Sequence, residues 1–159
     1  MKDLRDFIQK CEEEGELARI KAPVDWHLEL SHIAKLNEEK SGPALLFENV
    51  KDYKTPVLTS ACTTTNRLAL IMGMPRNTSL VELMREWVKR TRARIPPEWV
   101  ASPSAAPCKQ NIDMGDQINL LKFPVPHVYP KDGGRYFGTA VYVGSKDPDT
   151  GWVNIGTYR

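Results

Sequence analysis

Apolar residues near the N-terminus recur at i, i+3, i+4 and i+7, a spacing typical of one face of a helix. This pattern predicts a helix from Asp3, its N-cap, to about Glu14. Gly15 then ends the helix. The positions on its apolar face are Leu4, Phe7, Ile8 and Cys11. Between residues 16 and 21, Leu17 and Ile20 stand among polar neighbours, which predicts a short strand ended by Pro23.

The pattern then predicts a second helix over residues 28–40, stopped by Ser41-Gly42-Pro43. Short apolar runs predict strands at 44–50 and 56–62, and a short helix at 66–74 closed by Gly73 and Pro75. A last helix begins after Thr78 or Ser79 and runs to about Arg92. The residues expected to face inward are Leu30, Ile33, Ala34 and Leu36 in the second helix, and Leu80, Leu83, Met84, Trp87 and Val88 in the last. Residues 1–95 are thus expected to form an α/β domain with a mixed sheet.

The composition changes after this domain. Residues 95–107 are rich in Pro and Ser without periodicity, and Pro-rich character returns at 123–130, so we expect a connecting segment over 96–131. Residues 132–159 are expected to begin a second domain. Alternation at 138–145, a turn at 146–151 and a strand at 152–159 predict a β-hairpin. Because a lone hairpin is marginal in water, it must pair with more sheet.

Composition excludes several classes of protein. Of the 159 residues, 41% are apolar and 26% are charged, as in an ordinary soluble domain, and the net charge of +2 does not favour nucleic acid. No apolar stretch is long enough to span a membrane, and the N-terminus is not a signal peptide, so a cytoplasmic location is expected. The three widely spaced cysteines are expected to be reduced and structural: Cys11, Cys62 and Cys108.

Other chemical signals have simpler explanations. His27 and His32 are five residues apart, a poor spacing for two metal ligands on a helix, and His127 stands in a Pro-rich loop where packing is expected. The basic residues at 89–94 suit the C-terminal end of a helix. Gly133-Gly134 lacks the residues of a phosphate loop, so a turn is favoured. Trp87, Trp99 and Trp152 are expected in a core or an interface.

The final strand carries the most informative residues. Alternate side chains share a face of a strand, so Asn154, Gly156 and Tyr158 are expected on one face, and Ile155, Thr157 and Arg159 on the other. An Asn oxygen is a neutral hard ligand suited to Mg²⁺ or Mn²⁺. An Arg guanidinium binds a carboxylate in bidentate fashion. A glycine lets a flat ligand approach the backbone.

The sequence WVNIGTYR, at residues 152–159, resembles the segment that opens the prenylated-FMN site of the UbiD decarboxylase family. It follows a Pro-rich stretch, DGGRY at 132–136, the strand GTAVYVGS and a DPDTG turn, in the order of that family. DLRDFI, GELARI, GPALLFENV at 42–50 and NRLALIMGM at 66–74 resemble its N-terminal domain. The resemblance spans almost the whole chain and implies an α/β domain followed by the first strands of a cofactor-binding domain resembling a split β-barrel.

The resemblance also implies roles for single residues. Asn154 matches the asparagine that ligates a divalent metal, usually Mn²⁺, which holds the cofactor phosphate. Arg159 matches the catalytic arginine that orients the substrate carboxylate. The residues implied to line the prenylated flavin, partly through backbone groups, are Thr157, Tyr158 and Arg159. Thr139 is implied to lie near the flavin, and Ile155 to offer its backbone carbonyl to a K⁺ ion. The family's other metal ligands, a His and a Glu, and its catalytic acids have no counterpart here, so the isolated chain is expected to be inactive.

The activity implied is reversible, non-oxidative decarboxylation of small aromatic or α,β-unsaturated carboxylic acids. A UbiX-type flavin prenyltransferase is implied as the supplier of prenylated FMN, together with assembly into homo-oligomers. Two alternatives stay open. One is an FMN-binding split-barrel protein, disfavoured because the resemblance extends through the N-terminal domain; the other is a non-catalytic module, either a fragment or one subunit of a split decarboxylase.

Overall fold

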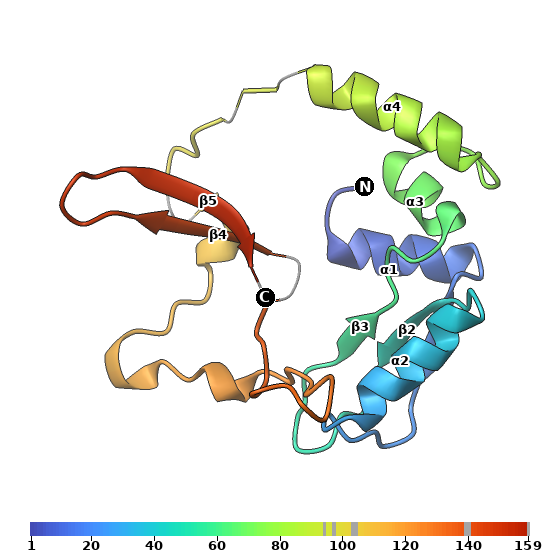
Figure 1. The fold of residues 1–159 in the computed structure, drawn as a ribbon, viewed down its shortest axis with the longest axis horizontal. Coiled ribbons are helices and arrows are strands. Elements are labelled where there is room, and N and C mark those ends of the chain that lie inside the picture. The colour runs from blue at the N-terminus through green and yellow to red at the C-terminus, as the bar shows by residue number, and fades with distance from the viewer. Residues whose placement is uncertain (94, 97, 103–104, 139–140, 159) are drawn as a thin grey trace.

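A computed structural model of the chain describes residues 1–93, 95–96, 98–102, 105–138 and 141–158 (Figure 1). Its first part holds four helices and three strands in an α/β arrangement. In chain order these are α1 (Leu4–Glu13), β1 (Leu17–Ile20), α2 (Glu29–Glu39), β2 (Ala44–Phe47), β3 (Val57–Thr59), α3 (Thr65–Met72) and α4 (Leu80–Arg92). Among the described residues after this part, short 3₁₀ helices and the hairpin strands follow: Pro107–Lys109, Gly115–Gln117, Leu120–Lys122, β4 (Val141–Lys146) and β5 (Val153–Tyr158).

The first three strands form a mixed sheet in the order β1-β2-β3. β1 pairs in parallel with β2, with Leu17 opposite Ala44, and β2 pairs antiparallel with β3, with Leu46 opposite Leu58. The central strand β2 is buried along its whole length, which explains why its sequence is an unbroken apolar run rather than an alternation. The predicted α/β class and mixed sheet are therefore confirmed, although the strand predicted at 56–62 is shorter, at Val57–Thr59.

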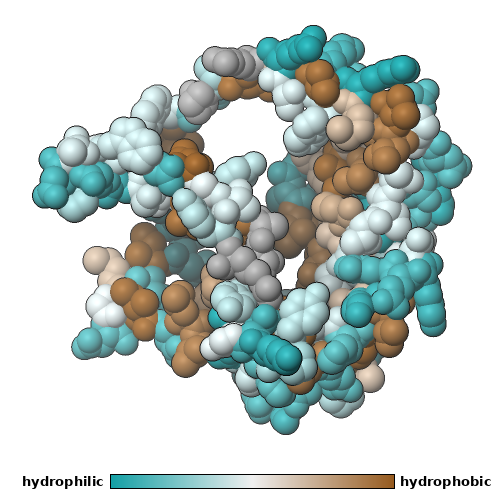
Figure 2. All heavy atoms as spheres, viewed as in Figure 1, coloured by the Kyte–Doolittle hydropathy of each residue, from teal (hydrophilic) through white to brown (hydrophobic). Residues whose placement is uncertain are grey.

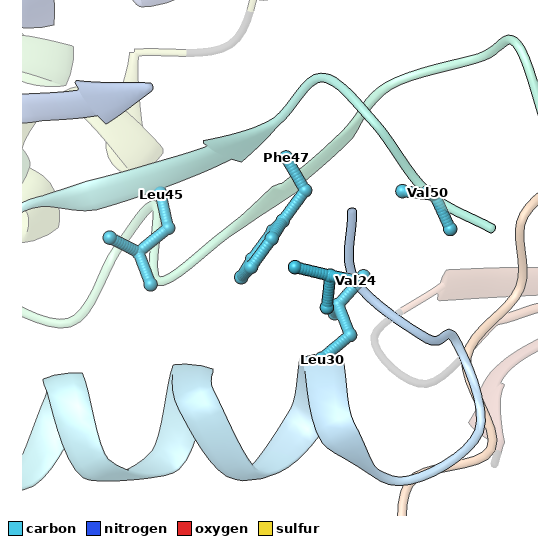
Figure 3. Packing of buried hydrophobic residues seen from close by; sticks show 5 residues of the cluster. All are labelled: Val24, Leu30, Leu45, Phe47 and Val50. Atoms are coloured by element: carbon cyan, nitrogen blue, oxygen red, sulfur yellow. The ribbon is translucent and has the colours of Figure 1, made fainter. Parts of the chain in front are cut away.

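The core lies between this sheet and α2. Figure 3 shows Leu30 at the start of α2 pointing towards Phe47 of β2, with Val24 and Val50 beside them. Leu45 completes the cluster, and partly buried side chains such as Trp26 and Tyr53 pack against its edge. Burial of five such side chains supplies much of the driving force for folding this domain, at about 1.5–3 kcal/mol each.

Helix ends agree with their predicted signals. The Asp3 carboxylate accepts a hydrogen bond from the Asp6 amide at 2.9 Å, so it caps α1 as expected. Ser79 and Glu82 form a reciprocal capping box at the start of α4. Gly15, the residue after the Glu14 C-cap of α1, adopts φ +70°, and Gly73, the C-cap of α3, adopts φ +64°. The left-handed conformation of these two residues explains why each helix stops at a glycine.

The predicted inward faces need correction in two helices. In α2, Leu30 and Ala34 are buried, but Leu36 is 58% exposed. In α4 only Leu83 is buried. The other α4 residues predicted to face inward are exposed: Leu80, Met84, Trp87 and Val88. Figure 2 shows apolar surface around this helix. The helical spacing was correct, but the pattern does not reveal whether this chain covers the apolar face of α4.

The three cysteines are free. Cys11 lies buried in α1, whereas Cys62 and Cys108 are exposed, so burial supports the expected structural role for Cys11 alone. Trp87, Trp99 and Trp152 are all more than half exposed, so none lies in the core of this chain, and their expected alternative role in an interface stays a prediction. In the part of the chain that the structure describes, no helix is long and apolar enough to cross a membrane.

Candidate functional site

The site begins with a docking segment, residues 123–137, which runs back along the first domain before the hairpin (Figure 1). The His127 amide donates to the Trp26 carbonyl at 3.1 Å, and the Leu28 amide donates to the His127 carbonyl at 3.0 Å. The imidazole rings of His27 and His127 lie 4.9 Å apart between centroids. The expected packing role of His127 is therefore confirmed, and these contacts fix the start of the docking segment.

Arg135 holds the far end of the docking segment. Its Nη1 donates to the Tyr53 hydroxyl at 2.7 Å, and its Cζ lies 4.4 Å from the centre of the Trp26 ring. The motif DGGRY contributes to the resemblance described above, but the sequence does not reveal this function of its arginine. The sequence shows only an Arg followed by two aromatic residues in a loop, and nothing in it pairs Arg135 with Tyr53, which is 82 positions away.

A carboxylate organises the turn between the hairpin strands. The side chain of Asp147 accepts hydrogen bonds from the amides of Asp149 and Thr150 and from the Thr150 hydroxyl, at 2.7–3.0 Å. These bonds, chiefly the one from the Thr150 amide, lower the pKa of the Asp147 carboxyl below its usual range. Gly151 adopts φ +73° and its amide donates to the Asp147 carbonyl at 3.0 Å. The turn thereby fixes the register of the two strands.

That register confirms the predicted faces of the last strand. Asn154 pairs with Ser145, Gly156 with Val143 and Tyr158 with Val141, so these six residues share one face of the hairpin. Ile155 and Thr157 lie on the other face, opposite Gly144 and Tyr142. The predicted site residues are therefore divided between two faces: Asn154 and Tyr158 on one, Ile155 and Thr157 on the other.

Asn154 and Tyr158 are in contact although four residues separate them. The Asn154 Nδ2 donates to the Tyr158 hydroxyl at 3.3 Å. The tyrosine ring reaches Asn154 by lying across Gly156. A Cβ at residue 156 would stand 2.6 Å from Tyr158 Cε2, closer than real contacts allow. The sequence Asn-x-Gly-x-Tyr thus forms one connected face, in which the Tyr158 ring covers Gly156 and contacts Asn154.

Two predicted site residues, Thr139 and Arg159, lie outside the described residues. The others differ in exposure. Ile155 is 69% exposed and Tyr158 is 55% exposed, whereas Asn154 and Gly156 are partly covered. The last strand is therefore open on both faces in the described part of the chain.

The chemistry of this face suits part of a metal site. Asn154 uses its amide nitrogen for Tyr158, so the hydrogen bond does not involve the oxygen that a hard cation needs. Across the described ranges, no cluster of three or more His, Cys, Asp or Glu side chains is arranged to hold a metal ion. The face therefore fits one neutral oxygen ligand of a cation rather than a complete centre.

Comparisons with protein families match both parts of the chain. Residues 8–87 match the N-terminal domain of 3-octaprenyl-4-hydroxybenzoate carboxy-lyase, the UbiD N-terminal domain. Residues 100–159 match the Rift-related domain of the same carboxy-lyase, and this second match includes the whole hairpin.

Solved structures agree with the family matches. Vanillic acid decarboxylase from Sedimentibacter hydroxybenzoicus, in its closed form, is 33% identical over 99% of this chain, with a TM-score of 0.85. An evolved dimeric form of the UbiD-class enzyme HmfF from Pelotomaculum thermopropionicum, in complex with prFMN, is 31% identical over 99%, with a TM-score of 0.78. A 3,4-dihydroxybenzoic acid decarboxylase from Enterobacter cloacae shares the fold at 23% identity and a TM-score of 0.79.

The chain spans about a third of the length of these relatives, 34–35% of each. The similarity covers both the first domain and the hairpin that carries the candidate site. The chain therefore belongs to the UbiD family of decarboxylases.

Proposed function

We propose that this chain is the N-terminal part of an enzyme that reversibly decarboxylates aromatic or α,β-unsaturated carboxylic acids with prenylated FMN and a divalent metal, Mn²⁺. The observation that carries the proposal is the Asn154–Gly156–Tyr158 face. It lies within the region matched by the Rift-related domain and has a single amide oxygen suited to a hard cation. One solved relative binds prFMN, which supports the choice of cofactor.

In this proposal residues 132–159 begin a split-barrel-like cofactor domain, and residues 1–95 form the preceding α/β domain. Asn154 supplies one metal ligand, and the flavin lies against the hairpin, in contact with Thr157, Tyr158 and Thr139. The contacts are partly through backbone groups, because the Thr157 and Tyr158 side chains lie on opposite faces of the strand. The Ile155 carbonyl serves a K⁺ ion. In this proposal the remaining metal ligands and the acids that transfer protons lie outside these 159 residues, so the chain by itself does not turn over substrate.

Arg159 is proposed to bind the substrate carboxylate. Its guanidinium offers two parallel N–H donors and stays charged at any working pH, so it orients the acid without a change of protonation. When bound, prenylated FMN supplies an electron sink for the bond to the carboxylate carbon. A UbiX-type prenyltransferase supplies this cofactor, and the complete enzyme assembles as a homo-oligomer.

The experiment uses the complete gene product, co-expressed with a flavin prenyltransferase and supplied with Mn²⁺. Release of CO₂ is measured over a panel of aromatic and α,β-unsaturated acids. Arg159→Ala is expected to lower kcat/KM by about a hundredfold or more while the flavin stays bound, because a misplaced substrate loses its reactive geometry. The matched control is Arg92→Ala in the last turn of α4, which should leave the rate unchanged. Equal rates for Arg159→Ala and the wild type would refute the role of Arg159.

The same experiment separates the proposal from the FMN-binding alternative. A protein that carries only unmodified FMN despite the prenyltransferase, and that releases no CO₂ from any acid in the panel, would contradict the proposed function.

A further inference from the structure

The contact between Asn154 and Tyr158 points to a role for the tyrosine that differs from contact with a flavin. A side-chain amide is planar, and its terminal torsion has a broad, roughly two-fold preference. An unrestrained asparagine therefore presents its nitrogen as readily as its oxygen to a given point. Only the oxygen ligates a cation, and the two amide hydrogens repel one.

The hydrogen bond removes this ambiguity. Because Nδ2 donates to the Tyr158 hydroxyl at 3.3 Å, Oδ1 lies on the other edge of the planar amide, away from the tyrosine. A cation bound at Oδ1 withdraws electrons from the amide and makes its N–H groups better donors, so the hydrogen bond and the metal bond strengthen each other. Outer partners of metal ligands commonly act in this way.

Gly156 makes the arrangement possible. Tyr158 reaches back along the strand by placing its ring directly over the glycine. A Cβ there would stand 2.6 Å from Cε2 and 2.9 Å from both Cζ and the hydroxyl oxygen. The φ of Gly156 does not lie in the left-handed region, so alanine suits its backbone and would displace only the tyrosine ring. The glycine is therefore needed for the side chain that crosses it.

We propose that Tyr158 is a positioning residue for the metal site: its hydroxyl holds the Asn154 amide with Oδ1 directed at the cation, and Gly156 gives its ring the space to do so. This inference rests on the proposed function, in which Asn154 is a metal ligand. It assigns Tyr158 an effect on metal affinity, which a residue that only lines the flavin would not have.

The test measures Mn²⁺ affinity rather than turnover. The complete gene product is purified with its flavin, stripped of metal with EDTA and titrated with Mn²⁺, and free Mn²⁺ is followed by electron paramagnetic resonance. Tyr158→Phe, which removes one oxygen, is expected to weaken Mn²⁺ binding about 10-fold. Gly156→Ala should weaken it by a similar factor through the displaced ring. The matched control is Tyr142→Phe, a tyrosine on the other face of the hairpin that is 86% exposed, which should bind Mn²⁺ like the wild type.

Two further variants make the outcomes distinct. The double variant Gly156→Ala/Tyr158→Phe should bind Mn²⁺ as tightly as whichever single variant binds it less tightly. The two effects do not add, because both changes remove the same hydrogen bond. Asn154→Ala should weaken binding more than either. If Asn154→Ala binds Mn²⁺ like the wild type, the metal role in the proposed function fails. If Asn154→Ala is impaired while Tyr158→Phe matches the wild type, the ligand assignment stands and the positioning role of Tyr158 is overturned.

Discussion

Arg67 and Glu16 form an ion pair inside the first domain: Arg67 Nη1 lies 2.9 Å from Glu16 Oε2, and the arginine side chain is completely buried. Arg67 Nη2 also donates to the Gly42 carbonyl at 3.0 Å and to the Thr63 hydroxyl at 2.7 Å. The pair joins α3 to the residue before β1, so it fixes the helix against the edge of the sheet.

Replacement of Arg67 tests how much this ion pair contributes to the free energy of unfolding. Arg67→Met leaves the mostly buried Glu16 carboxylate without its main partner, and we expect a loss of about 3–5 kcal/mol in the free energy of unfolding. The matched control is Arg76→Met, which removes the second guanidinium bound to Glu16. Arg76 is 53% exposed, so its loss should cost about 0–1 kcal/mol. Urea unfolding measures the free energy of unfolding of both variants. Equal losses in the two variants would show that the buried ion pair contributes no more to stability than the exposed one.

The docking segment should depend on Arg135. Arg135→Ala removes the contact with the Trp26 ring and the hydrogen bond to Tyr53, which together stabilise the docked segment by about 1–2 kcal/mol. Amide hydrogen exchange at His127, whose N–H bonds to the Trp26 carbonyl, should become about 10-fold faster. Lys131→Ala, in the same segment but exposed, is the control for lost positive charge. Unchanged exchange in Arg135→Ala would show that the arginine does not hold the segment.

Thiol reactivity should separate the three cysteines. Burial raises the pKa of the Cys11 thiol from 9.0 to about 11, so the folded state favours its protonated form. The stability from this neutral thiol is complete below about pH 9 and falls as the pH rises towards 11. At pH 8, the exposed thiols of Cys62 and Cys108 should react quickly with Ellman's reagent. The buried thiol of Cys11 should react only after unfolding. Rapid reaction of all three would place Cys11 at the surface.

The hairpin turn should loosen at low pH. Hydrogen bonds from Thr150 and Asp149 lower the pKa of Asp147, so its carboxylate stabilises the turn above the usual Asp range near pH 4. That stabilisation is lost as the pH falls through the lowered pKa. Exchange of the Gly151 amide should accelerate there, and Asp147→Ala should remove the dependence on pH. Asp149→Ala, which keeps the Asp147 carboxylate, is the control and should retain it.

Local signals in the sequence predicted local structure well. Asp3, Gly15, Gly73 and Ser79 marked helix ends because each satisfies or ends the backbone hydrogen bonds of its own helix. The alternation at residues 153–158 gave the faces of the last strand because register follows from the turn. Contacts between residues far apart in the sequence have no local signal that predicts them. The Arg67–Glu16 and Arg135–Tyr53 contacts are two examples.

The apolar face of α4 shows that the sequence pattern does not predict which side chains are buried. Leu80, Met84 and Trp87 have the spacing of a buried face, yet each is more than half exposed. Periodicity identifies which side chains share a face, whereas burial depends on what packs there. In the candidate site, likewise, the pattern placed Asn154 and Tyr158 on one face but did not predict that they bond across Gly156.

In the proposed function, this chain forms part of a prenylated-FMN and Mn²⁺ enzyme. Native mass spectrometry tests it most directly, on the complete gene product co-expressed with a flavin prenyltransferase and supplied with Mn²⁺. We predict a protein that carries the mass of prenylated FMN together with bound manganese, and loss of the manganese in Asn154→Ala. A protein that carries neither flavin nor metal under these conditions would contradict the account.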